Sequence, residues 1–232
     1  MEFKHFVVEE IVQEAADVRT FKLSPISGSI PKYQPGQFFL LRLPDGTGKY
    51  IHRPYSVASH PEEPNLWFCI KNKGFFPSLL WKLKPKDSLE LDGPYGIFLL
   101  GKEDKERVFI GGGVGISALR SMIIQTVKEN LPAWLFHSAH TKEGLIYFDQ
   151  MQALSSSYSS FKFFPSISGD NIPFGWSGLK GRITVEILKE KLGSLQGKSF
   201  YLCGSKEMVS SLASSLMTSG VPKESIKKDE WG

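Results

Sequence analysis

The chain has 232 residues, of which 41% are hydrophobic and 22% charged, as in globular proteins that bury one large or two small cores. This composition excludes disordered, collagen-like and coiled-coil proteins. Lys and Arg number 28 against 24 Asp and Glu, a net charge of +4 that is too small for a nucleic-acid-binding surface.

Cys69 and Cys203 are the two cysteines. Two thiols cannot form an all-cysteine zinc site or ligate an iron–sulfur cluster, so we expect no metal centre. Such sparse cysteine is typical of a reducing compartment. No apolar run approaches the roughly 20 residues of a membrane-spanning helix, and the N-terminal residues lack signal-peptide or transit-peptide features. We therefore expect a soluble, cytoplasmic protein.

Residues 1–101 contain short β-rich runs separated by turn-forming Pro, Gly and Asp residues. The predicted strands are residues 3–9, 18–23, 37–43, 53–58, 65–71 and 88–91. A short helix is predicted over residues 75–83. Six short strands at this spacing indicate an antiparallel barrel or sandwich, which forms the first predicted domain.

The charged segment 102–106 is predicted to link this domain to a second one, residues 107–232. The second domain opens on an apolar run, 107–110, which leads into glycines and then into apolar residues at helical spacing. Further strand-like runs follow at 133–136, 161–167 and 200–203, and the serine-rich segment 154–160 is expected to be a mobile loop. This alternation predicts an α/β, Rossmann-like domain with a parallel sheet between helices.

The glycine loop carries the first candidate site. Residues 113–118, Gly-Val-Gly-Ile-Ser-Ala, fit the G-x-G-x-x-A form of the dinucleotide-binding fingerprint. Glycines before a helix let backbone N–H groups approach a phosphate. The acidic residue expected about 20 positions later is absent from residues 137–141. The alternative is a tight strand-to-helix turn that binds nothing.

Arg53-Pro54-Tyr55-Ser56 carries the second candidate site. Along a strand, Arg53 and Tyr55 share one face about 7 Å apart. Arg53 could therefore bind a phosphate while Tyr55 covers a flat cofactor. Pro54 cannot donate to a ladder, which favours an edge or a strand start. The alternative is an ordinary strand with an exposed arginine.

Two further segments end predicted strands. Residues 71–78 form a strand end, a glycine turn and a helix start, where a second anion could bind. Cys203-Gly204 ends an apolar strand, and in open α/β sheets ligands bind beyond the carboxyl ends of strands. Cys203 would then face the same crevice as Gly113. The alternatives are a plain turn and a small buried hydrophobic residue.

The order of these motifs resembles that of the ferredoxin–NADP reductase superfamily, over essentially the whole chain. The motifs are residues 53–56, 74–78, 93–96 (Gly-Pro-Tyr-Gly), 111–117, 203–204 and 230–232. The resemblance implies an antiparallel flavin-binding barrel followed by an NAD(P)-binding α/β domain.

The resemblance also implies roles in flavin binding. Arg53 would contact the flavin phosphate, Tyr55 would stack on the isoalloxazine ring, and Ser56 would hydrogen-bond near its reactive nitrogen. The segment that includes Lys71, Gly74, Phe75 and Ser78 would hold the ribityl chain and pyrophosphate, which favours FAD over FMN.

For the nucleotide, the resemblance implies a path lined by Gly112, Gly113, Val114, Gly115 and Ser117, with Cys203, Gly204 and Met208 beside the nicotinamide. Ser56, Cys203 and Glu230 are expected nearest the reacting atoms, as positioning groups. Trp231 would cover the flavin or fill the domain seam. His140 stands where the family commonly has Arg, which favours NADH, although Arg182 keeps NADPH open.

The predicted function is therefore transfer of hydride from NAD(P)H to FAD and then of electrons to a ferredoxin, flavodoxin or oxygenase component. An acidic partner could bind the lysines at positions 71, 73, 82, 84, 86, 102 and 105, or these lysines simply form a solvated face. The alternatives are a flavin-binding electron-transfer subunit of a larger redox complex, with little activity alone, and a nucleotide sensor without flavin.

Overall fold

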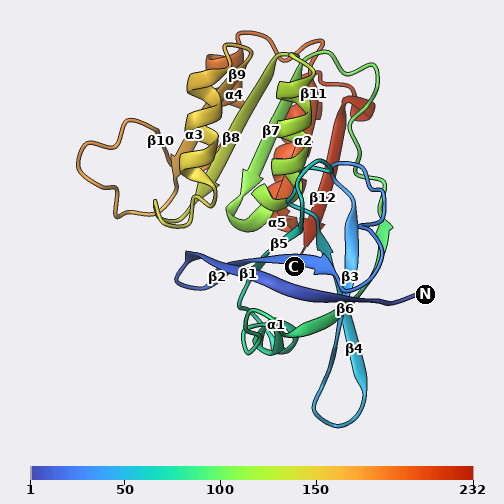
Figure 1. Ribbon diagram of the computed structural model, residues 1–232. Coiled ribbons are helices and arrows are strands. Elements are labelled where there is room, and N and C mark those ends of the chain that lie inside the picture. The colour runs from blue at the N-terminus through green and yellow to red at the C-terminus, as the bar shows by residue number, and fades with distance from the viewer. Residues whose placement is uncertain (1, 232) are drawn as a thin grey trace.

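The computed structural model describes residues 2–231, except for the side chain of Trp231. Within these residues the chain forms two six-stranded sheets (Figure 1). The first sheet is antiparallel, in the order β4-β3-β6-β1-β2-β5. Its strands are β1 (Lys4–Ala15), β2 (Val18–Pro25), β3 (Phe38–Pro44), β4 (Tyr50–Ser56), β5 (Leu66–Lys71) and β6 (Ser88–Tyr95), and the short helix α1 (Phe75–Leu80) lies between β5 and β6.

Alternating side chains build the core of this first domain. Along β3, Phe39, Leu41 and Leu43 are buried while their neighbours are partly exposed. The buried face meets the apolar residues of β2, β5 and β6 in one core cluster. The predicted antiparallel domain is confirmed. β1 is longer than the predicted strand, because a register shift between Val8 and Glu10 interrupts its alternation.

The second sheet is parallel, in the order β10-β9-β8-β7-β11-β12. Its strands are β7 (Arg107–Gly112), β8 (Ala133–Ala139), β9 (Phe161–Ile167), β10 (Leu179–Lys180), β11 (Ser199–Ser205) and β12 (Ile226–Trp231). Its helices are α2 (Ile116–Lys128), α3 (Phe148–Ser157), α4 (Val185–Leu192) and α5 (Lys206–Thr218), with short 3-10 turns η1 (Gly113–Gly115) and η2 (Lys223–Ser225). The predicted Rossmann-like domain is confirmed.

The helices cover both faces of this sheet. Figure 1 shows α2 and α3 on one side and α4 and α5 on the other, and each pair packs on its own apolar cluster. Strand residues alternate between the two clusters: Phe109 faces α2, whereas Val108 and Ile110 face α4 and α5. This alternation is what a parallel strand buried on both faces requires.

One prediction for this domain was wrong, and one strand was missed. The serine-rich segment 154–160 is not simply a mobile loop, because α3 runs through its first four residues, to Ser157. The hydroxyl of Ser155 donates to the backbone oxygen of Phe161 at 3.3 Å and accepts from the N–H of Phe163 at 3.2 Å, which ties the helix to β9. β12 was not predicted, because four charged residues in a row, Lys227 to Glu230, hide its alternation.

Contacts join the two domains. The hydroxyl of Thr20 lies 2.9 Å from that of Tyr147. In the linker, Asp104 binds Lys227 and Tyr201 of the second domain. Arg120 is fully buried in this seam. None of the helices in residues 2–231 is long and apolar enough to cross a membrane.

Candidate functional site

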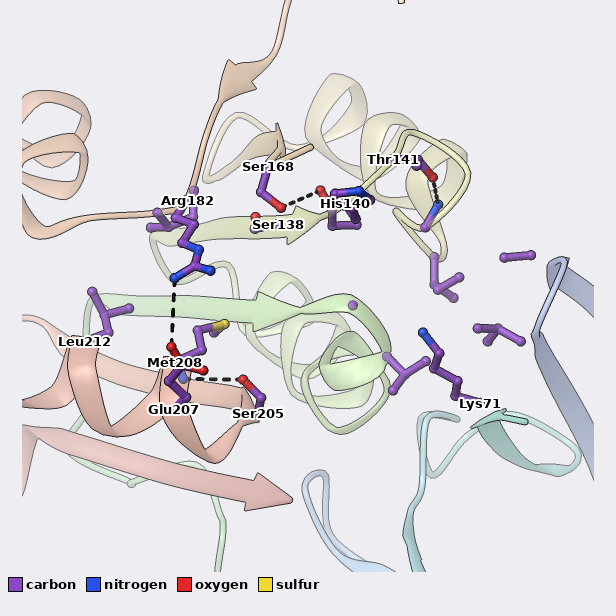
Figure 2. A pocket seen from close by; sticks show the side chains of 18 of the residues that line it. Lys71, Ser138, His140, Thr141, Ser168, Arg182, Ser205, Glu207, Met208 and Leu212 are labelled. Atoms are coloured by element: carbon purple, nitrogen blue, oxygen red, sulfur yellow. Dashed lines mark hydrogen bonds and ion pairs between the residues drawn. The ribbon is translucent and has the colours of Figure 1, made fainter. Parts of the chain in front are cut away.

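A pocket of about 750 Å³ lies at the carboxyl ends of the parallel strands (Figure 2). The residues that follow β7, β8 and β9 form one wall, and the start of α5 forms another. The turn between β1 and β2, with Lys71, closes the end that faces the first domain. This is the place where ligands bind in open α/β folds.

The glycine loop forms the floor of this pocket. Gly113 has a φ of +52° with open space beside it, and no described side chain caps α2, whose first turn follows the loop. The N–H of Ile116 donates within the loop, to the backbone oxygen of Gly113, and beside Gly113 the loop offers an anion backbone without a side chain in the way. A Cβ at Gly112 would lie 2.5 Å from the Met208 sulfur, so only glycine lets Met208 pack there. The hydroxyl of Ser117 donates to the backbone oxygen of Val114 at 2.7 Å, which stabilises the loop from within.

His137 supports the same loop from below, and sequence reasoning missed it. Its Nε2 donates to the backbone oxygen of Gly113 at 2.9 Å. Burial lowers the pKa of His137 to about 4, against the effect of this hydrogen bond, so the ring is neutral at neutral pH. In the sequence, His137 stands within an apolar run. That pattern does not distinguish a histidine that supports a loop from any other buried histidine.

His140 and Arg182, the two basic residues considered for nucleotide selectivity, both line this pocket. Both are exposed, and Figure 2 shows Arg182 extending toward Glu207, whose carboxylate lies 4.0 Å from its guanidinium. Glu143 and Glu186 line the same pocket. Acidic groups therefore offset the positive charge available to a ligand.

β4 presents the predicted flavin motif. Arg53 is exposed and forms no ion pair with any described residue; its guanidinium donates to the backbone oxygen of His52 at 2.8 Å. Tyr55 is half-buried and stacks on Phe76 of α1, with ring centroids 6.1 Å apart. Burial raises the pKa of Tyr55 to about 12, against the nearby charge of Arg53, so its hydroxyl stays protonated. An unpaired cation and an aromatic face thus stand side by side.

The turn after β5 is exposed to solvent. Gly74 has a φ of +97° with free space beside it, and Phe75 is 62% exposed. The hydroxyl of Ser78 donates to the backbone oxygen of Phe75, within the same turn of helix, at 2.6 Å. Lys71 pairs with Asp17 at 3.2 Å and faces the pocket described above.

Ser56, Cys203 and a carboxylate converge where β4, β11 and β12 meet. The Asp229 Oδ2 atom lies 3.4 Å from the Ser56 hydroxyl and 3.9 Å from the Cys203 sulfur. Asp229 was not predicted, whereas the predicted Glu230 lies 3.8 Å from Lys228. Neighbouring strand residues point to opposite faces, and register pairs Asp229 with Cys203. The pairing of β12 with β11 would have identified Asp229 as the neighbour of Cys203. Because β12 was not predicted, that pairing was not known.

Burial governs the ionisation of this cluster. It raises the pKa of Cys203 well above its ordinary value, and the nearby Asp229 adds to the effect. The thiol is therefore protonated at neutral pH and is no nucleophile. Burial also raises the pKa of Asp229, against the hydrogen bonds from Ser56 and Cys203. The cluster joins a hydroxyl of the first domain to a carboxyl and a thiol of the second.

The remaining predicted residues frame the cluster. Gly204 is buried, and a Cβ there would lie 3.2 Å from the Met208 sulfur. Ser205 caps α5, with its hydroxyl accepting from the Met208 N–H at 3.3 Å. The backbone of Trp231 pairs with Ser205, but its predicted flavin-covering side chain lies outside the described residues.

Family comparisons match both halves of the chain. The model of the oxidoreductase FAD-binding domain matches residues 5–99, and that of the oxidoreductase NAD-binding domain matches residues 109–214. The described residues fit both FAD and a nicotinamide nucleotide. For FAD, the guanidinium of Arg53 has no carboxylate partner among them and lies on the same strand as the Tyr55 ring. For the nucleotide, the glycine loop leaves space that larger side chains would fill.

Among curated proteins, one subunit of the Na(+)-translocating NADH-quinone reductase of Neisseria gonorrhoeae is 29% identical in an alignment 202 positions long, which covers 78% of this chain and 49% of the relative. The same component of the Actinobacillus pleuropneumoniae reductase is 27% identical over 84% of this chain and 52% of its own length. The chain thus spans about half the length of these relatives.

Solved structures share the whole architecture. A ferredoxin NADP+ reductase from Neisseria gonorrhoeae with bound FAD and NADP is 25% identical, with a TM-score of 0.87 over 99% of both chains. The FAD/NAD-binding domain of a nitric oxide dioxygenase from Vibrio cholerae has a TM-score of 0.90 at 23% identity, over 99% of this chain and 98% of the other.

Proposed function

The chain belongs to the ferredoxin–NADP reductase superfamily and is a FAD-dependent NAD(P)H oxidoreductase; from this premise we propose that it oxidises NADH and delivers the electrons to a protein acceptor. The observation that carries the proposal is the convergence of Ser56, Cys203 and Asp229 beside the pocket. The first domain supplies one of these residues and the second supplies two.

FAD, when bound, supplies the ring that takes up hydride and releases electrons. Within our proposal, Arg53 binds its phosphate and Tyr55 packs against its flat face. The glycine loop holds the pyrophosphate of the nucleotide through backbone N–H groups. The buried, neutral Cys203 packs beside the nicotinamide and keeps water away, while the Asp229 carboxylate accepts a hydrogen bond from the Ser56 hydroxyl across the domain boundary.

The choice of NADH rests on the charges of the pocket. An added 2′-phosphate would need an uncompensated cation, but Arg182 faces Glu207 and Lys71 faces Asp17. Two further carboxylates, Glu143 and Glu186, line the pocket and would repel it. The activity for which the curated relatives are named, NADH-quinone reduction, supports the same choice.

The proposed acceptor is a redox protein that binds the exposed lysines of the first domain and linker. All seven are exposed, at positions 71, 73, 82, 84, 86, 102 and 105. Complementary charge favours such an encounter. The NADH-quinone reductase relatives favour a second candidate function, in which this chain is the NADH-oxidising part of a larger redox complex.

Anaerobic stopped-flow reduction of the purified yellow protein tests the proposal. We expect NADH to bleach the flavin absorbance rapidly and NADPH to do so more slowly. Faster bleaching by NADPH would reject the preference for NADH that the pocket charges predict. A yellow protein that neither nucleotide bleaches would reject independent reductase activity and favour the complex-subunit function.

A further inference from the structure

Arg120, in the second turn of α2, has a fully buried side chain in the seam between the domains. Its two terminal nitrogens bind the two carboxylate oxygens of Glu63 at 2.7 and 2.8 Å. One of them also donates to the backbone oxygen of Ala58 at 2.8 Å, and Nε donates to Gln150 at 2.8 Å. The planar guanidinium can satisfy all these acceptors at once.

Aromatic rings enclose this pair. The guanidinium carbon lies 4.2 Å from the centre of the Trp67 ring and 5.4 Å from that of Tyr147. Burial alone would raise the pKa of Glu63, but the hydrogen bonds and charge of Arg120 outweigh it and hold that pKa below its ordinary value. The pair is therefore an ionised contact of fixed geometry, and not a fluctuating surface ion pair.

The two ends of this contact lie next to the two halves of the reaction site. Ala58 follows Ser56 by two residues, at the end of the flavin motif. Arg120 follows Gly115 by five residues, a rise of about 7.5 Å along a rigid helix that begins at the glycine loop. A shift of Arg120 relative to Ala58 is therefore a shift of the loop relative to Ser56.

We propose that Arg120 is a positioning residue for hydride transfer, which fixes the distance between the glycine loop and the flavin strand by clamping α2 to Ala58 and Glu63. The inference rests on the proposed function. A misplacement of about 1 Å between reacting groups can slow a reaction about 100-fold, so a small movement at this contact has a large effect.

The chain offers a matched control in the residue next to Glu63. Glu62 binds Lys128, which is also on α2, so this pair joins the same two elements with the same charges. Its side chains are 67% and 45% exposed, and such surface pairs contribute little. If the contact works because it is buried, substitution of Arg120 should slow the reaction and substitution of Lys128 should not.

The first experiment compares Arg120→Met and Lys128→Met in anaerobic flavin reduction at saturating NADH. We expect Arg120→Met to keep its FAD but to be reduced about 10- to 100-fold more slowly. Lys128→Met should stay within about twofold of the wild type. Arg120→Lys should recover part of the rate, since a single ammonium can reach Glu63 but cannot hold all acceptors.

A double variant separates position from stability. Arg120→Met strands the Glu63 charge, whereas Glu63→Gln with Arg120→Met removes both charges and should recover the melting temperature. The inference predicts that its reduction stays slow. Recovery of the rate together with the melting temperature would show that the pair only stabilises the fold.

Hydrogen exchange provides a readout that needs no turnover. We expect faster amide exchange at residues 113–116 in Arg120→Met, but not in Lys128→Met, with or without FAD. Unchanged amide exchange at residues 113–116 would overturn the inference. A wild type that fails to react with NADH would reject the proposed function, but the exchange result would still test the inference. A wild type that reacts rapidly, with Arg120→Met equally rapid, would reject the inference alone.

Discussion

Arg53 owes its proposed role to what it lacks within residues 2–231: a carboxylate partner. Because no carboxylate occupies the guanidinium of Arg53, its N–H groups can bind the phosphate of a ligand. If Arg53 were paired with a carboxylate, it would be an ordinary surface residue with no indication of a ligand.

Arg53→Ala is therefore expected to lose FAD during purification. The fold should persist, because the side chain is exposed and packs against no core. The flavin-to-protein absorbance ratio measures this loss, and Arg19→Ala, at another site on the first sheet, serves as control. Full retention of FAD by Arg53→Ala would remove Arg53 from the flavin site.

Asp229 combines a raised pKa with contacts to both domains. A carboxyl whose pKa is higher in the folded than in the unfolded state favours folding at low pH, and this contribution is lost as the pH rises through its folded pKa. Asp229→Asn should thus not lower the melting temperature at pH 7.

Asp229→Asn should nevertheless change catalysis. We expect the variant's flavin to be reduced more slowly. We also expect the pH profile of the reduction rate to lose the ionisation of the Asp229 carboxyl, because an amide does not titrate. Glu230→Gln is the informative comparison, since the sequence pattern pointed to that residue. A pH profile altered by Glu230→Gln and not by Asp229→Asn would reverse the assignment.

At the scale of elements, predictability followed the strength of the local pattern. The glycine loop and its flanking strand and helix were predictable, because an apolar run, glycines and helical spacing occur in sequence. β12 was not, because Lys227, Lys228 and Glu230 leave it looking like an exposed tail. Its role depends on pairing with β11, a long-range contact that local patterns do not encode.

Gly112 links two elements that the sequence keeps far apart, β7 and α5. Gly112→Ala places a methyl group 2.5 Å from the Met208 sulfur, which must move into the pocket. Overpacking of this kind costs about 1–3 kcal/mol, and we expect it as a KM for NADH raised several-fold, measured in steady state. Met208→Ala in the same chain should restore the KM; a KM unaffected by Gly112→Ala would contradict this packing.

At the scale of the molecule, a carboxylate with a lowered pKa ties the linker between the domains to the second domain. Burial opposes the effect, but hydrogen bonds from Lys227 and Tyr201 lower the pKa of Asp104 to about 2. Asp104 joins the linker to β11 and β12. A carboxyl whose folded pKa is depressed stabilises the protein above its unfolded pKa, and this stability is lost as the pH falls through the folded value.

Asp104→Asn should therefore lower stability at pH 7 by about 1–2 kcal/mol, a value reduced for partial exposure to solvent. The difference from the wild type should shrink below pH 4 and vanish near pH 2. Urea unfolding across this range measures it, with the exposed Glu103→Gln as control. A difference that stayed constant with pH would show that charge is not the cause.

The buried Arg120–Glu63 pair also limits how such proteins can be recombined. A chimera that joined the first half of this chain to the second half of a relative would carry Glu63 into a seam shaped by another sequence. Without an arginine at the facing position, that partly buried carboxylate would be left without its partner, however well either half folds. The glycine loop and the flavin strand can be exchanged freely as motifs, but the halves that carry them are interchangeable only between lineages that share this one buried charge pair.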